Sequence, residues 1–425
     1  MNHNSFLTAC ALPVVPKPLS WSSIKSATDY NLVQYFESIA SKSLTTVKEG
    51  APDLRDVLIR IALSNGAPLS TAVLQSLLAF SSLHRHGLQS HAARLKLSAI
   101  SALAASARTG VGVHQVISHV ATLMLLCCFE IQQASEASTQ WLFYISGVKN
   151  VLRAAHLGPV QNTSDMAALL YWVSYHDVLA KFSLYYWRHR HPLQNTLHDD
   201  FAIQVPQISF GELVKVCLKP ILSRYNFAHI QYQVPKYRFP CMGMVKLMSD
   251  VFNMVLEPLE ARPHGLDHQN LLTILEWKIR QDPALEGPKA QSACQELPGH
   301  DLTLETFQLS LLVYVERLVD RTPGQSAKMR SIIEKAMAVF SQLESLDRQF
   351  PLLILGCEAR SDRHRMVVLD LIARTENRGG VRSPQGIKSL IQSLWAQDDL
   401  SEQEIPYMDK IHAVLSSSAI LPALV

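Results

Sequence analysis

The sequence has little excess charge of either sign. Its 39 lysines and arginines against 36 aspartates and glutamates leave a net charge of +3 over 425 residues. So small an excess predicts no basic footprint over the whole chain of the kind that nucleic-acid binding needs. Apolar residues make up 48% and charged residues 18%, which excludes a disordered chain and indicates a globular one.

Long apolar runs are also scarce. Residues 123–129 are all apolar, but seven residues are far fewer than the roughly 20 that cross a bilayer, and His119 and Glu130 flank them. This run therefore predicts a buried core helix and no membrane segment. The N-terminus has no positive charge before its short apolar stretch and is interrupted by Pro13, so residues 1–29 are expected to be a disordered tail rather than a signal peptide.

The cysteines lack the spacing of metal sites and of disulfide frameworks. There are seven, an odd number, with no pair separated by two residues. This usage favours a reducing compartment and free thiols that pack as small apolar side chains.

Sequence motifs of catalysis and cofactor binding are absent as well. The chain has no GxxxxGK[ST], GxSxG or HExxH segment, and Gly110 and Gly112 lack the third glycine of a dinucleotide loop. The adjacent acids Asp199–Asp200 and Asp398–Asp399 are expected to lie on solvated loops. The second pair is followed by Leu400, Ser401 and Glu402, so it does not complete the DDxxD motif of a helical lyase or cyclase.

Histidine pairs and basic clusters do not point to a binding site either. His84 with His86, and His189 with His191, are two residues apart and would not face one way on a helix, so we expect solvated helix ends. The basic residues at 187–191 fit the end of a helix, and those at 360–365 are nearly balanced by Glu358 and Asp362. No catalytic, cofactor-binding, metal-binding or DNA-binding residue is assigned, and no cofactor is expected.

Helical periodicity fills most of the chain, and alternating β-branched runs are rare. Residues 114–190 are predicted to form three consecutive central helices, with Trp141 on the buried face of the second and Asp165 in the first turn of the third. The pattern predicts one large all-α domain of stacked antiparallel helices over residues 30–425. Further helices are expected at 210–224, 242–256, 271–279, 304–319, 327–346, 352–373 and 387–395.

Three stretches carry a family resemblance. They are residues 92–103 (AARLKLSAISAL) with the leucine-rich helix that follows, residues 141–152 (WLFYISGVKNVL), and residues 350–359 (FPLLILGCEA) with the later Trp395 and Asp398. The second is similar to a W-x-x-H-L-x-G-A-x-x-L-L pattern, with Tyr144 in the place of histidine. Together they resemble the fungal-specific transcription factor domain, the regulatory region downstream of the zinc binuclear cluster in many fungal regulators.

The residues of these stretches have structural interpretations of their own. Gly147 and Gly356 would let neighbouring helices approach closely, and Trp395 would anchor the C-terminal helix. Glu358 is expected to pair with Arg363 or Arg360.

The resemblance implies a transcription regulator that acts in the nucleus, controls secondary-metabolite genes and is not an enzyme. A zinc binuclear cluster needs six cysteines, and only Cys10 lies in the N-terminal region, so no direct sequence-specific DNA binding is expected. Expected partners are other transcription proteins or a DNA-binding partner, with a small-molecule effector and a homodimer both possible. The alternative hypothesis is a helical interaction scaffold outside transcription. Target genes, effector and oligomeric state stay open, and so does whether the chain is a complete gene product or lacks an upstream zinc cluster.

Overall fold

The structure is a computed structural model that describes a defined set of residues. These are residues 24, 26–44, 46–47, 52–64, 68–107, 113–133, 139–154, 164–188, 240–256, 268–281, 298–319, 324–378, 385–402, 405–418 and 421–425. Within them the chain forms 15 α-helices and one short 3-10 helix and contains no strand. The all-α prediction is therefore confirmed, while the helix expected at 210–224 lies outside the described residues.

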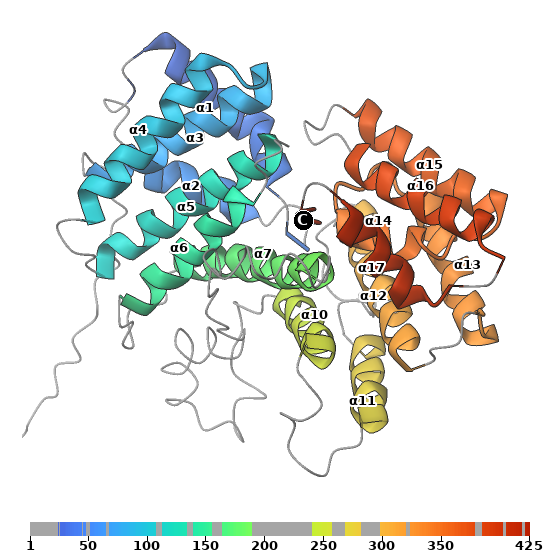
Figure 1. Cartoon of the computed structure of the whole chain (residues 1–425). Helices are drawn as coiled ribbons and strands as arrows, with labels where there is room; N and C mark the ends of the chain where they lie inside the picture. Colours follow the sequence, from blue (N-terminus) through green and yellow to red (C-terminus); the bar gives the residue numbers. More distant parts are fainter. Residues whose placement is uncertain are drawn as a thin grey trace, which may run out of the picture.

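The N-terminal helices form the blue to green part of Figure 1. Several have visible start and stop signals: Ser26 caps α1, Asp165 lies in the first turn of α7, and Gly87 ends α3 with a φ of 70°. The elements are α1 (Ala27–Ser38), η2 (Ala40–Ser43), α2 (Pro52–Ala62), α3 (Pro68–His86), α4 (Ser90–Ala107), α5 (Val113–Gln133), α6 (Gln140–Ala154) and α7 (Ser164–Arg188).

The later helices form the yellow to red part of Figure 1. Ser326 and Ser361 cap two of them by accepting hydrogen bonds from Met329 N and His364 N. The elements are α10 (Pro240–Leu256), α11 (His268–Arg280), α12 (Pro298–Val319), α13 (Ala327–Gln342), α14 (Gln349–Gly356), α15 (Asp362–Asn377), α16 (Gln385–Leu400) and α17 (Tyr407–Ser417).

At the C-terminal end the structure differs from the predicted elements in three places. The single segment expected at 352–373 is two helices, because the chain turns at residues 357–361 between α14 and α15. The helix expected at 387–395 extends over Gln385–Leu400, so Asp398 and Asp399 lie on α16 and not on a loop. The last helix, α17, was not predicted.

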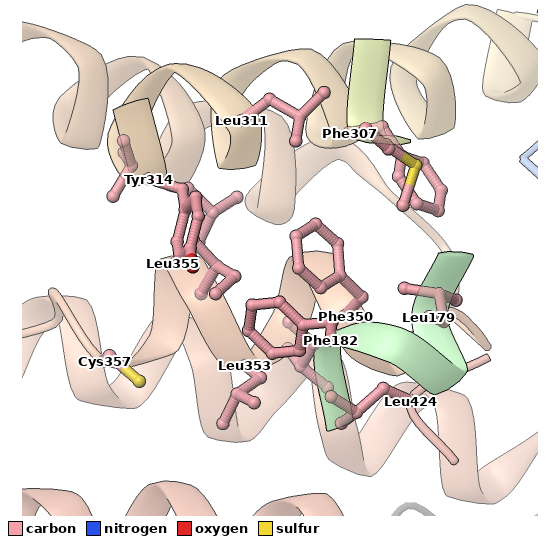
Figure 2. Packing of buried hydrophobic residues seen from close by; sticks show 14 of the residues in the cluster. Leu179, Phe182, Phe307, Leu311, Tyr314, Phe350, Leu353, Leu355, Cys357 and Leu424 are labelled. Carbon is pink, nitrogen blue, oxygen red and sulfur yellow. The ribbon is translucent and has the colours of Figure 1, made fainter. Parts of the chain in front are cut away.

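Two hydrophobic clusters fill the interior. The first is built on α1 to α5 and includes Phe36, Phe80 and Phe129, all at most 2% exposed. The second is built on α10 to α17, and Figure 2 shows its aromatic centre. There the ring centroid of Phe182 lies 5.6 Å from that of Tyr314 and 5.3 Å from that of Phe350. Edge-to-face packing of this kind adds to the stabilisation from burial.

Helix α7 belongs to both clusters. Its first half places Trp172 and Val173 in the N-terminal cluster, and its second half places Leu179 and Phe182 in the C-terminal one. Figure 1 shows α7 below the gap between the two sets of helices, with the C-terminus of the chain in that gap. The prediction of three consecutive central helices over residues 114–190 is confirmed by α5, α6 and α7. Trp141 of α6 is 2% exposed and is part of the core.

Within the described residues, one helix has the length and composition of a membrane span. It lies in α5, at Gln115–Gln133, and 67% of its most apolar window is buried inside the fold. Its neighbours are α3, α4, α6 and α7. It packs as a core helix, in agreement with the sequence interpretation.

Candidate functional site

The turn between α14 and α15 lies at the centre of a group of polar contacts. Its residues 357–359 are buried, and α16 packs against the preceding helix α14. Gly356 makes this approach possible, because a Cβ atom there would lie 2.9 Å from Ile391 Cδ1 on α16. Trp395 Nε1 then donates to the Gly356 carbonyl at 2.9 Å, and Tyr407 Oη donates to the Ile354 carbonyl at 3.0 Å.

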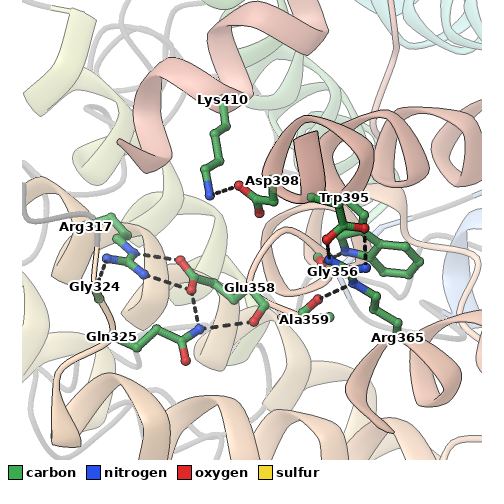
Figure 3. Close-up of polar contacts among 11 residues, drawn as sticks. Arg317, Gly324, Gln325, Gly356, Glu358, Ala359, Arg365, Trp395, Asp398 and Lys410 are labelled. Carbon is green, nitrogen blue, oxygen red and sulfur yellow. Dashed lines mark hydrogen bonds and ion pairs between the residues drawn. The ribbon is translucent and has the colours of Figure 1, made fainter. Parts of the chain in front are cut away.

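Glu358, at the centre of this turn, forms a buried ion pair with Arg317 of α12 (Figure 3). Arg317 Nε and Nη2 donate to the two carboxylate oxygens at 2.6 and 2.8 Å, and the two side chains are 2% and 1% exposed. The expected pairing with Arg363 or Arg360 is therefore wrong. Both candidates are near Glu358 in sequence, whereas the true partner is 41 residues away.

The remaining polar atoms around this pair are also hydrogen-bonded. Arg317 Nη1 donates to the Gly324 carbonyl at 2.7 Å, and Gln325 Nε2 donates to Glu358 Oε2 at 2.7 Å and to the Glu358 carbonyl at 3.1 Å. The guanidinium also lies 5.5 Å from the ring centroid of Tyr407. Additional bonds of this kind offset part of the hydration that a buried ion pair loses.

Two further ion pairs fasten α16 to its neighbours. Arg365 of α15 donates to both carboxylate oxygens of Asp399 at 2.8 and 2.7 Å, and its guanidinium lies 5.4 Å from the Trp395 ring centroid. Lys410 of α17, 5% exposed in its side chain, pairs with Asp398. The two adjacent aspartates thus hold two different helices, and neither is the free carboxylate that the sequence interpretation had placed on a loop.

Two titratable groups of this centre, the Cys357 thiol and the Tyr407 hydroxyl, are held in their neutral forms. Burial raises the pKa of the Cys357 thiol well above its usual value, and the neighbouring Glu358 charge raises it further. Burial likewise raises the pKa of Tyr407 well above its usual value. A thiol kept protonated in this way is a poor nucleophile. The centre is arranged to hold four helices and a turn in fixed relation.

The histidines are used as packed polar side chains. His84 is 6% exposed and its Nδ1 lies 2.9 Å from Tyr35 Oη, so its assignment to a solvated helix end is wrong; His86 is exposed as predicted. Burial lowers the pKa of His84 to about 4. His189 and His191 lie outside the described residues. In the described part of the chain no group of three histidine, cysteine or acidic side chains could hold a metal ion.

Several residues of the centre escaped sequence interpretation, including Arg317, Gln325 and Lys410. Only Arg317 left a signal. It follows Glu316 inside the otherwise apolar stretch 311–319, and a charge on a buried helix needs a partner. Gly147, by contrast, is not required by close packing, since a Cβ atom would meet Leu123 at an ordinary 3.5 Å.

Comparison with known proteins gives two matches and one negative result. Residues 31–416 match the family described as the fungal specific transcription factor domain. The chain is also 35% identical over 412 residues to the transcription factor iacI of Pestalotiopsis fici, which covers 96% of this chain and 98% of that protein. No solved structure matches the chain. The stretches at 92–103, 141–152 and 350–359 all lie within the matched region.

Proposed function

This chain belongs to the fungal specific transcription factor domain family and is a fungal transcription regulator, and we propose that it acts in the nucleus through protein contacts made by its helical domain. In this proposal it performs no catalysis, and it reaches its target genes through a DNA-binding partner. The relative bears the name of a transcription factor, which supports the regulatory part.

The cysteines carry the argument that contact with DNA is indirect. A zinc binuclear cluster requires six thiolate ligands that can reach two metal ions. Three of the seven cysteines, Cys127, Cys128 and Cys357, are at most 8% exposed and lie within the hydrophobic clusters. Four cysteines cannot supply six ligands. These 425 residues therefore cannot build a zinc binuclear cluster, and any DNA selectivity of the regulator has another source.

The buried ionic centre supports a role in contact rather than in chemistry. Arg317, Glu358 and Gln325 fix the turn after α14, and Arg365 and Lys410 fix α16 against α15 and α17. A scaffold fixed in this way presents its outer helix faces in constant geometry, which favours recognition by a partner. Control of secondary-metabolite genes, and response to a metabolite effector, are proposed from the family resemblance.

A tethering experiment tests the regulatory proposal. The whole chain is fused to an unrelated DNA-binding domain and placed upstream of a reporter gene in a fungal host. The proposal predicts reporter expression several-fold above that of the DNA-binding domain alone, and a loss of that gain when Glu358→Ala disrupts the centre. Equal expression with and without the chain, at equal protein levels, would count against it. A tagged chain that stays in the cytoplasm under all conditions would exclude the nuclear part.

A further inference from the structure

Helix α11 carries an apolar surface that the fold leaves uncovered. Its inner side buries Leu272, Leu275 and Ile279, which are at most 7% exposed, against α12 and α10. On its outer side Trp277 is 62% exposed and Ile274 is 45% exposed. Residues three apart are neighbours on a helix surface, so these two side chains form one continuous patch. Figure 1 shows α11 at the lower edge of the described helices.

Cationic side chains lie on both sides of this patch. At 100° per residue, Trp277 lies near the middle of the outer face, with Arg280 towards one flank and Lys278 towards the other. On the first flank Lys328 of α13 reaches α11, since its Nζ lies 2.9 Å from Glu276 Oε1. On the second flank the charges of Lys246 of α10 and Lys278 both lower the pKa of Asp250, so both lysines lie near its carboxylate.

The acidic groups of this region lie deeper than the cations. On the α13 side Glu276 is 20% exposed, whereas Arg280 and Lys328, which pair with it, are 44% and 43% exposed. Glu316, the second partner of Lys328, is only 12% exposed. On the other side Asp250 is partly buried, and burial raises its pKa, while Lys246 and Lys278 are exposed. Among the described residues, the outermost charged groups around Trp277 are therefore cations.

We propose that the outer face of α11, with Trp277 and Ile274 at its centre and Lys246, Lys278, Arg280 and Lys328 at its rim, docks an acidic amphipathic helix of a partner protein. The partner would cover Trp277 with leucine or phenylalanine side chains and place aspartates and glutamates against the four cations. An exposed tryptophan within a charged rim is the usual anchor of such an interface, and amphipathic helices bind through apolar residues at i, i+3, i+4 and i+7. This names the partner class of the regulatory role proposed above and rests on it.

A binding experiment with the purified full chain tests the inference. The probe is a fluorescently labelled peptide of about 18 residues, long enough for four to five helical turns, with leucine and phenylalanine at i, i+3, i+4 and i+7 and glutamate elsewhere. We expect saturable binding by fluorescence anisotropy, weakened about tenfold or more by Trp277→Ala. Lys278→Glu combined with Arg280→Glu should weaken binding and reduce its dependence on salt, because fewer charge pairs remain to be screened.

Three controls separate the proposed docking from other effects. The same peptide with lysine in place of glutamate should not bind, and Leu400→Ala, at a side chain 85% exposed on α16, should leave the affinity unchanged. Circular dichroism shows whether the Trp277→Ala protein is folded. If it is not, Ile274→Glu serves as the second variant that tests the same face. Peptide binding that is absent at about millimolar concentration, or unaffected by both α11 variants, would overturn the inference.

Self-association is the competing occupant of this face. Sedimentation equilibrium would show it as a dimer that Trp277→Ala dissociates, and that result would contradict the proposed partner helix. A chain that binds the acidic peptide through Trp277 but activates no tethered reporter would instead count against the regulatory proposal alone.

Discussion

The carboxylate of Glu358 accepts two hydrogen bonds from the guanidinium of Arg317, at 2.6 and 2.8 Å, where both side chains are at most 2% exposed. This contact joins the turn after α14 to the end of α12. Arg317 also donates to the Gly324 carbonyl, and Glu358 also accepts from Gln325. These extra hydrogen bonds fix the orientation of both side chains.

Removal of one partner should therefore destabilise the fold strongly. Glu358→Ala leaves the Arg317 charge buried without its partner, and we expect the free energy of unfolding in urea to fall by about 3–5 kcal/mol. Asp370→Ala is the matched control, because Asp370 pairs with Arg374 at a side chain 67% exposed and should contribute no more than about 1 kcal/mol. The double variant Arg317→Met with Glu358→Leu should recover most of the loss. Equal effects of Glu358→Ala and Asp370→Ala would show that the buried pair contributes no more than a surface pair.

The two glycines at helix contacts should respond in opposite directions to alanine. Gly356→Ala places a methyl group 2.9 Å from Ile391 Cδ1 and should lower stability by about 1–3 kcal/mol. Gly147→Ala meets Leu123 at 3.5 Å and should raise stability by up to about 1 kcal/mol, since alanine is the better helix former. Ile391→Val removes the Cδ1 atom and should restore part of the loss at Gly356. Thermal melts of the wild type, the two alanine variants and the double variant Gly356→Ala with Ile391→Val check this order. Stabilisation by Gly356→Ala would contradict it.

Two tryptophans, one on α6 and one on α11, should differ in their contribution to stability. Trp141 is 2% exposed within the core, and Trp141→Ala should cost about 3–5 kcal/mol of folding free energy. Trp277 is 62% exposed, so Trp277→Ala should change stability by no more than about 0.5 kcal/mol. Urea denaturation of both variants measures the difference, and a Trp141→Ala protein as stable as wild type would remove that side chain from the core.

Acid should destabilise the N-terminal helices through His84. Its pKa is about 4 in the fold, because burial disfavours the charged ring, and about 6.5 in the unfolded chain. The unfolded state therefore binds more protons between these values. The stability that His84 contributes is present above about pH 6.5 and is lost as the pH falls towards 4, by about 3 kcal/mol at most.

The measurement is the free energy of unfolding at several pH values between 4 and 7. His84→Gln should flatten the curve in this window, whereas His86→Gln, at an exposed position, should leave it unchanged. A wild-type curve that is flat from pH 7 to 4 would show that His84 is not kept neutral by the fold.

Much of the fold follows from local sequence patterns. Apolar spacing located the central helices α5, α6 and α7, and Asp165 marked the start of α7 correctly. The break between α14 and α15 was missed because apolar residues continue on both sides of it. It depends on contacts of Glu358 and Gly356 with α12 and α16, which a local pattern does not contain.

The polar centre was less accessible to sequence interpretation. Glu358, Gly356 and Trp395 were singled out, but the partners Arg317 and Lys410 are distant along the chain. Pairing between distant side chains is decided by how helices pack, and a single sequence gives no signal of which arginine meets which acid. The same limit explains why the uncovered face of α11 could not be distinguished from its buried face before the neighbours of the helix were known.

The most direct test of the central claim is a gel-shift measurement with the purified chain of residues 1–425 and promoter fragments of the genes it regulates. Because these residues cannot supply six cysteine ligands for a zinc binuclear cluster, the chain alone should give no tight, sequence-selective shift, with or without added zinc. A complex that forms at nanomolar concentration, and that an excess of unrelated DNA does not displace, would contradict the claim that these 425 residues hold no DNA-reading module of their own.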